Sequence, residues 1–99
     1  MTIFNLIKTL DYPVAYGYHN TRPELPYFCI IGAGQEQFEA DNTYYIRKDN
    51  WQIEYYFRKK DPELEATIED LLLENGYKYE KSEDVYIEGE DVFLIYYNI

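Results

Sequence analysis

Apolar positions recur with the period of a helix in the first residues of the chain. Apolar side chains recur at the i, i+3, i+4, i+7 spacing and predict a helix over residues 2–10 with one buried face. Thr2 can cap its start, and Pro13 ends it because the residue before a proline is pushed out of helical geometry. A strand is then predicted over residues 14–18, where Val and Tyr alternate with Ala and Gly.

The next stretch is predicted to contain one central strand and an excursion from it. Residues 21–26 contain two prolines and are predicted to form a loop, and residues 27–31 are apolar on both faces, as in a central strand. The Gly-Ala-Gly of residues 32–34 is predicted to break that strand. Residues 35–42 are polar apart from Phe38, and they are expected to form either a loop or a long protruding hairpin.

The clearest period of two in the chain follows. A strand is predicted over residues 44–47 and a tight turn over residues 48–50. From residue 51 to residue 58 apolar and polar side chains alternate, so one face of this strand is core and the other is wet or covered by a partner. The residues predicted to face the core are Trp51, Ile53, Tyr55 and Phe57.

The second helix has a start signal, an apolar stripe and a stop signal. Asp61 is predicted to cap it, Pro62 occupies its first position, and Asn75-Gly76 closes it with a left-handed cap. The predicted buried stripe is Leu64, Ile68, Leu71 and Leu72, and the predicted acidic remainder is Glu63, Glu65, Glu69, Asp70 and Glu74. Two last strands are predicted over residues 77–87 and 92–97, joined by a turn at residues 88–91.

These elements predict an α+β fold with the order α-β-β-β-β-α-β-β. A chain of 99 residues makes one domain, residues 1–99, with a modest single core. The predicted architecture is a mostly antiparallel sheet with two helices packed on one of its faces.

Composition adds a strong segregation of charge. Residues 1–60 contain seven acidic and seven basic side chains, whereas residues 61–99 contain twelve acidic residues against Lys78 and Lys81. The whole net charge of −10 therefore belongs to the second half of the chain. Such a balance argues against direct nucleic-acid binding, which needs a positive face for several phosphate contacts.

Aromatic residues point toward protein contacts. The chain has 13 Tyr, 5 Phe and one Trp, and tyrosine suits half-buried sheet faces and interfaces. The one cysteine, Cys29, stands in an apolar run and is expected to be a buried small hydrophobe. The first residues lack the pattern of a signal peptide and no segment has the length of a membrane span, so we expect no membrane partner.

A search for catalytic chemistry yields no convergent motif. The one histidine, His19, lies in a predicted loop and is expected to be solvated, without the His or Cys partners that a zinc site needs. The paired carboxylates fall in turns and on a wet helix face, where solvation keeps their pKa values ordinary. We therefore expect a non-enzymatic protein with no cofactor, no metal and no catalytic residue.

Several stretches, taken in order, resemble one family. They are residues 13–17 (PVAYG), 25–27 (LPY), 40–45 (ADNTYY), 59–65 (KKDPELE), 74–77 (ENGY) and 79–83 (YEKSE). The chain is similar to the small tail-completion proteins of long-tailed phages and prophages, which are related to tail terminators and head–tail joining proteins. The resemblance runs over most of the chain.

The resemblance implies an α+β subunit of a homo-oligomeric ring, typically a hexamer, on the head-proximal end of the tail tube. Such a ring halts growth of the tube, presents a docking face to the head-connector protein, and surrounds the channel through which DNA leaves. It implies a virion protein of the tail or neck, made in the bacterial cytoplasm, with neither cofactor nor catalytic motif.

The ring hypothesis names the residues that should meet a partner. The cluster Arg58-Lys59-Lys60 of one subunit is expected to approach acids of the next, in the helix at residues 61–75 or the turn at 83–91. The excursion at residues 35–42 is expected to reach a neighbouring ring or the tube. The full set of candidate interface residues is Arg58, Lys59, Lys60, Glu69, Asp70, Glu36, Phe38, Glu39, Tyr44 and Tyr56.

An alternative of a different class remains open. The excess of acids after Lys60 also suits a small DNA mimic that captures a basic nucleic-acid-processing protein. Such a mimic needs acids in two rows spaced like phosphates. The patterned core faces and the many tyrosines favour sheet packing and protein contacts instead.

Overall fold

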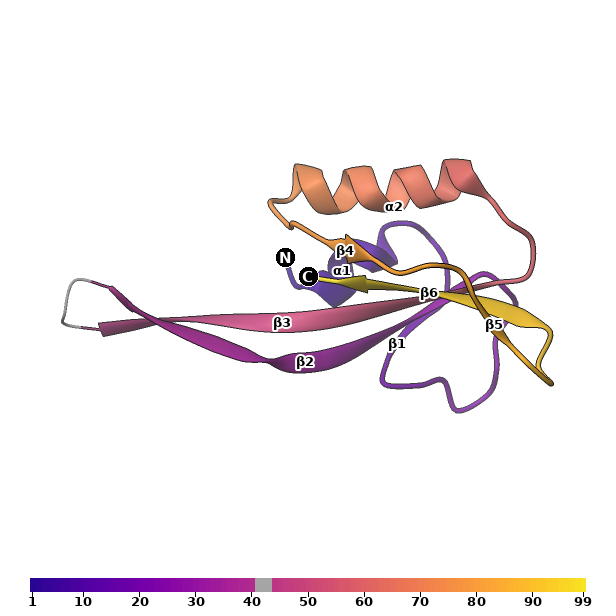
Figure 1. Cartoon of the computed structure of the whole chain (residues 1–99), viewed down its shortest axis with the longest axis horizontal. Helices are drawn as coiled ribbons and strands as arrows, with labels where there is room; N and C mark the ends of the chain where they lie inside the picture. The colour runs from indigo at the N-terminus through magenta and orange to yellow at the C-terminus, as the bar shows by residue number, and fades with distance from the viewer. Residues whose placement is uncertain (41–43) are drawn as a thin grey trace.

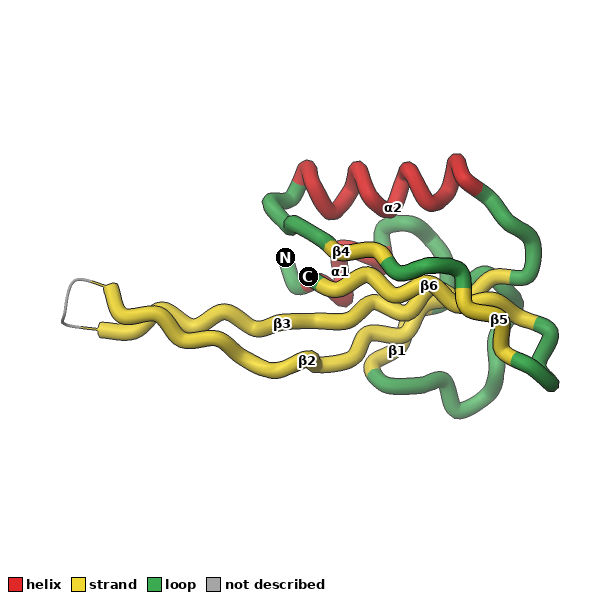
Figure 2. Tube along the Cα trace, in the orientation of Figure 1, coloured by secondary structure: helices red, strands yellow, loops and turns green. Residues whose placement is uncertain are grey.

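The protein is a twisted sheet with both helices on one side and a long hairpin extending from one end (Figure 1). The computed structural model describes residues 1–40 and 44–99. These residues span 51 × 26 × 23 Å. Figure 2 shows that most of the excess length comes from one pair of strands, which continues well beyond the rest of the sheet.

The sheet has six strands and is mostly antiparallel, as the sequence predicted. They are β1 (Val14–Tyr16), β2 (Tyr27–Ala40), β3 (Tyr44–Phe57), β4 (Glu80–Lys81), β5 (Val85–Ile87) and β6 (Val92–Asn98). The order across the sheet is β1-β2-β3-β6-β4, with β5 also paired to β6, and β1 alone runs parallel to its neighbour. The predicted α+β class is confirmed, and the observed order of elements is α-β-β-β-α-β-β-β.

Both helices begin where local chemistry predicted. Helix α1 (Ile3–Lys8) is capped by the Thr2 hydroxyl, which accepts the Asn5 backbone N–H at 3.1 Å. Helix α2 (Pro62–Glu74) is capped by Asp61, whose carboxylate accepts the Leu64 backbone N–H at 3.1 Å. It ends at Asn75 and Gly76, and the positive φ of Gly76 (83°) gives the predicted left-handed cap.

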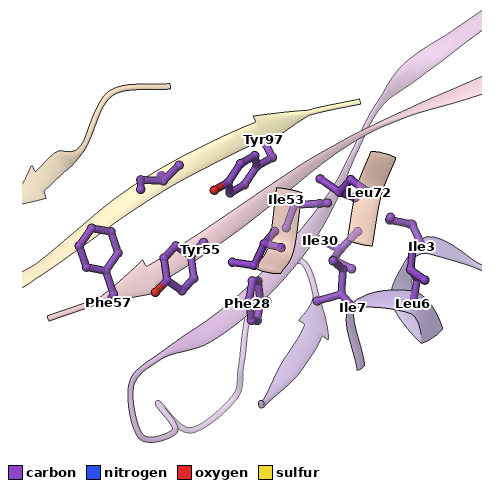
Figure 3. Close-up of a cluster of buried hydrophobic side chains, with 12 residues drawn as sticks. Ile3, Leu6, Ile7, Phe28, Ile30, Ile53, Tyr55, Phe57, Leu72 and Tyr97 are labelled. Carbon is purple, nitrogen blue, oxygen red and sulfur yellow. The ribbon is translucent and has the colours of Figure 1, made fainter. Parts of the chain in front are cut away.

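The core lies between the two helices and one face of the sheet (Figure 3). Register places Phe28 of β2 and Ile95 of β6 on either side of Tyr55, so the three form one row across the sheet. Helices α1 and α2 cover these rows with apolar side chains. The buried cluster is Ile3, Leu6, Ile7, Phe28, Ile30, Ile53, Tyr55, Phe57, Ile68, Leu72, Ile95 and Tyr97.

Two sequence predictions about the hairpin were wrong. The Gly-Ala-Gly of residues 32–34 does not end β2; it forms an irregularity with a register shift between Gly32 and Gln35, after which pairing resumes. The turn predicted at residues 48–50 is part of β3. Polar side chains are compatible with a strand here because both faces of this ribbon are exposed to solvent. Neither face packs on the core, so the sequence shows no alternation of apolar and polar residues.

The strand predicted over residues 77–87 is divided into β4 and β5. Between them Ser82 bonds to Tyr96 of β6 in place of a regular pair of backbone hydrogen bonds. Its backbone N–H donates to the Tyr96 carbonyl at 2.9 Å, and its hydroxyl accepts the Tyr96 N–H at 2.8 Å. The side chain therefore takes over a backbone bond and lets the strand bend. The predicted turn at residues 88–91 joins β5 to β6 as expected.

Candidate functional site

The outer half of the β2–β3 hairpin stands away from the body of the protein. We call residues 33–40 of β2 with 44–50 of β3 the arm. The sheet neighbours β1 and β6 pair only with residues 28–30 of β2 and 52–57 of β3, so the arm is a ribbon of two strands. The structure thus favours the protruding hairpin over the loop among the two forms expected for residues 35–42, of which 41 and 42 lie outside the described residues.

The arm carries an exposed apolar pair. Phe38 and Ile46 are register partners on adjacent strands, and each side chain is about half exposed, at 50% and 51%. Glu36 and Lys48 form the next pair on the same ribbon face, with 3.8 Å between Lys48 Nζ and Glu36 Oε2. An exposed cross-strand apolar pair is a candidate contact surface, since such pairs stabilise a sheet most when they are covered.

The other arm face holds the remaining predicted contacts. Glu39 is the register partner of Tyr45, whose side chain is 67% exposed. Gln35 donates a hydrogen bond from Nε2 to Asp49 Oδ1 at 2.8 Å, and this bond links the two strands at the base of the arm. The candidate Tyr44 belongs to β3 through its backbone, and its side chain lies outside the described part of the chain.

The second candidate surface is the sheet face turned away from both helices. We call it the open face; its residues are Tyr27, Cys29, Ile31, Gln52, Glu54, Tyr56, Leu94 and Tyr96. Neither helix packs on it, and the segment between β1 and β2 passes along it on the side opposite α2 (Figure 1). The rings of Tyr27 and Tyr56 stack there with centroids 4.7 Å apart, and these two residues are also register partners.

His19 sits at the edge of the open face and is not simply solvated as expected. Its Nε2 lies 3.0 Å from the Phe28 carbonyl oxygen, and its ring meets Tyr27 edge-on at 5.2 Å. The expectation for Cys29 is confirmed, because it is buried and free. Burial raises the pKa of its thiol to about 11, so at neutral pH it is the unreactive thiol.

Glu54 stands near the centre of the open face without a cation. Its carboxylate accepts a hydrogen bond from the Tyr56 hydroxyl at 3.0 Å. None of the ion pairs among the described residues includes Glu54. Burial raises the pKa of this carboxyl, and the Tyr56 hydrogen bond only partly offsets the rise.

The predicted basic cluster meets acids within its own chain. Lys60 Nζ lies 2.7 Å from Glu65 Oε2 and 3.0 Å from Asp84 Oδ1, and Arg58 Nε lies 3.7 Å from Asp91 Oδ2. These acids belong to the helix and the turn that were expected to receive the cluster from another subunit. Lys59 is exposed and takes part in none of the ion pairs among the described residues.

Glu69 and Asp70 differ in their surroundings. Glu69 was expected on the wet side of its helix, but its Oε2 accepts the Tyr97 hydroxyl at 2.7 Å and lies 2.9 Å from Lys81 Nζ. Tyr79 donates to its Oε1 at 3.3 Å. Glu69 therefore fastens α2 to the sheet, and a contact with another chain is left to the exposed Asp70.

Sequence reasoning placed Glu65 on the wet side of the helix, and this was wrong. Its side chain is 4% exposed, with Lys81 Nζ 2.8 Å from Oε1 and Lys60 Nζ 2.9 Å from the same oxygen. Among the ion pairs of the described residues, Oε2 is paired with Lys60 alone, whose Nζ lies 2.7 Å away. The available signal was its position three residues before Ile68 and seven before Leu72, on the buried stripe.

A cleft of about 820 Å³ opens where β3 leads into α2. Arg22 and Lys59 line it together with Asp61 and Glu63, so side chains of both charges line the cleft. No group of three or more metal-ligating side chains occurs among residues 1–40 and 44–99. None of the helices in these ranges combines the length and apolarity needed to cross a membrane.

The geometry therefore offers two surfaces suited to protein contact, the arm and the open face. A comparison with protein-family models found no family that matches the chain, and a comparison with curated proteins found no match either.

Proposed function

We propose that this protein is a phage or prophage virion structural protein whose copies form a closed ring on the tail tube. In this proposal the ring caps the tube and joins it to the head-connector protein. It acts by protein–protein assembly, without catalysis and without a cofactor. The subunit is made in the bacterial cytoplasm and resides in the tail or neck of the virion, with DNA passing through the ring.

One observation carries the proposal: a single small subunit has two unlike surfaces, the protruding arm and the sheet face on which neither helix packs. The arm exposes the pair Phe38 and Ile46, and the open face carries the half-buried Tyr27–Tyr56 stack. A ring is a heterologous assembly, in which each subunit uses one surface toward each neighbour. An isolated two-stranded ribbon is marginal in water, so the arm gains most from a partner that packs on it.

The acidic half of the chain fits this proposal better than it fits a DNA mimic. Four of its acids are within 4 Å of a lysine or arginine of the same subunit; they are Glu65, Glu69, Asp84 and Asp91. Two of the four are turned toward the sheet, so they cannot belong to rows of exposed phosphate-like charges. The remaining exposed acids suit a surface past which DNA slides without binding.

The test is the mass of the assembled protein and its effect on tubes. We expect native mass spectrometry to give one closed oligomer, a hexamer, for the protein alone or with tail-tube protein. Negative-stain images should show rings, and adding the protein to polymerising tail-tube protein should stop tube growth at a capped end. A monomer at high concentration in both settings, with tubes of unchanged length, would overturn the proposal.

A separate experiment addresses the DNA mimic. Tagged protein is incubated with lysate of infected bacteria, and captured proteins are identified by mass spectrometry. Tail and neck proteins favour the ring, whereas a DNA-processing enzyme that binds in proportion to the tagged protein favours mimicry.

A further inference from the structure

We infer that the arm of one copy packs on the open face of a second copy, with Lys48 of the arm opposite Glu54 of the open face. The inference rests on the proposed ring and deepens it by naming the two surfaces that meet. The occupant of the open face is thus a second copy of this chain. Three observations support it: the incomplete arm, the uncompensated carboxylate, and their matching spacing.

The arm needs a packing partner. It is a ribbon of two strands whose side chains at residues 33–39 and 45–49 are all exposed. Its apolar pair, Phe38 and Ile46, is on one face, whereas the exposed Tyr45 on the opposite face is the register partner of Glu39, so the face of the pair is the more apolar one. The body of the same subunit cannot supply the cover, because the arm extends away from it (Figure 2).

The open face needs a cation. Glu54 is half-buried on it, and the structure gives it a hydroxyl donor from Tyr56 but no lysine or arginine among the described residues. A partner that covers this face with apolar groups alone would bury an unpaired carboxylate at a high cost. The partner must therefore bring a positive charge to the same place as its apolar side chains.

The arm brings both at the required distance. Lys48 and Ile46 stand two residues apart on one ribbon face, which corresponds to about 7 Å along the strand. Glu54 and Tyr56 are also two residues apart on one face, and the same spacing applies. With Lys48 opposite Glu54, Ile46 meets the platform formed by Tyr56 stacked on Tyr27.

Lys48 is free to make this contact. Its pairing with Glu36 is long, at 3.8 Å, and both side chains are more than half exposed. An exposed pair of this kind contributes little to stability, so exchanging it for a contact with a shielded carboxylate is favourable. Arg47 points to the opposite ribbon face with Gln37 and is not the cation in this arrangement.

The first test is a charge exchange. Lys48→Glu alone and Glu54→Lys alone should each weaken association by about tenfold or more, and the double variant should restore it to within about threefold of the wild type. The measurement is the concentration dependence of the oligomer mass. If the two single effects simply add in the double variant, the residues do not meet.

The second test does not depend on tolerance of a lysine on the sheet. In a Cys29→Ser background, Lys48→Cys and Glu54→Cys are combined and treated with a bis-maleimide that spans about 10 Å, the spacing of packed sheets. Positions 48 and 54 lie on the same strand about 20 Å apart, beyond the reach of this reagent within one chain. We therefore expect a ladder of cross-linked species, from dimers up to the full number of subunits in the ring.

The single-cysteine variants provide the controls and separate the outcomes. Each variant alone should give no linked product, because the contact is between unlike surfaces. Their equal mixture should give dimers only, because each chain carries a single cysteine. Dimers from Lys48→Cys alone would show that arms pair with arms and would overturn the inference. Rings by native mass spectrometry without any ladder would also overturn it while leaving the proposed function intact. Monomers in both native mass spectrometry and cross-linking would overturn both the inference and the proposed function.

Discussion

Lys81 Nζ lies 2.8 Å from Oε1 of Glu65, and this contact joins the short strand β4 to the buried side of α2. The same ammonium lies 2.9 Å from Oε2 of Glu69, one helical turn further along α2. Lys60 reaches Glu65 from the other side and also holds Asp84. The helix is thus fixed to the sheet by a charged network as well as by its apolar stripe, Ile68 and Leu72.

The first prediction concerns the two lysines of this network. Lys81→Met leaves the carboxylates of Glu65 and Glu69 short of a cation, and it should lower the free energy of unfolding by about 2–4 kcal/mol. Lys60→Met should lower the free energy of unfolding by about 1 kcal/mol, because Lys81 still pairs with Glu65 and the Lys60 side chain is nearly half exposed. Urea denaturation measures both values.

The exposed Lys78 provides the matched control for this comparison. Lys78→Met should change the free energy of unfolding by less than about 0.5 kcal/mol. Equal losses for Lys81→Met and Lys60→Met would contradict the prediction, because they would show that Lys81 stabilises the fold no more than Lys60 does.

The second prediction is an acid-sensitive contribution from Glu69. Burial raises the pKa of its carboxyl, but hydrogen bonds from Lys81 and Tyr97 outweigh the rise and hold the pKa below its ordinary value of 4.5. Because the folded protein binds this proton less tightly than the unfolded chain, Glu69 stabilises the fold above the unfolded pKa. That stabilisation is lost as the pH falls from about 4.5 through the lowered folded value.

Denaturation of wild type and Glu69→Gln at several pH values checks this. The wild type should be more stable at neutral pH, and the difference between the two proteins should shrink as the pH falls below about 4.5. A difference that stays constant over the acid range would mean that the ionised carboxylate of Glu69 is not the stabilising form.

Local signals predicted the parts of the fold that local chemistry determines. Asp61 before Pro62 and Gly76 after Asn75 act through their own backbone neighbours, so the bounds of α2 followed from the sequence. The alternation from Trp51 to Phe57 was informative because one face of that segment rests on the core.

The arm and the charged network could not be predicted in the same way. Residues 44–50 have no core to face, so their side chains carry no apolar period and looked like a short strand and a turn. Glu65 looked solvated because a glutamate is rarely buried, and its burial depends on Lys81, sixteen residues later. The candidate interface residues Lys60 and Glu69 were identified as charged, but their partners within the chain depend on tertiary structure.

The third prediction separates stability from assembly at Glu54. Because burial raises the pKa of this carboxyl in the folded subunit, its ionisation destabilises the fold as the pH rises through that raised value. Glu54→Gln should therefore raise the free energy of unfolding of the dissociated subunit at pH 7, and the gain should vanish in acid below the unfolded pKa. The same variant should weaken ring formation, because Lys48 of the neighbour loses its partner.

Glu80→Gln is the control for this prediction, since Glu80 is exposed and takes part in none of the described ion pairs. It should leave both stability and oligomer mass unchanged. A Glu54→Gln protein that is less stable at pH 7 as a monomer would contradict the sign of the pKa shift.

The fourth prediction removes the arm without touching the core. Gly32 and Trp51 are register partners, so replacing residues 33–50 by Asn-Gly joins them through a two-residue hairpin turn. The truncated chain should fold with its core intact, because none of the core residues lies in the removed segment. It should fail to form rings and to complete tails, as judged by native mass spectrometry and by the titre of infectious particles.

A finer version of this prediction tests the apolar pair alone. Phe38→Ser with Ile46→Ser should leave the free energy of unfolding within about 1 kcal/mol of wild type, because both side chains are already half exposed. Ring formation should weaken by about tenfold or more, since their burial is expected only between copies. Leu73→Ser on α2, at a side chain 54% exposed, removes similar apolar surface elsewhere and should have no such effect. Equal oligomer stability in the two variants would mean that the arm meets its neighbour by some other face.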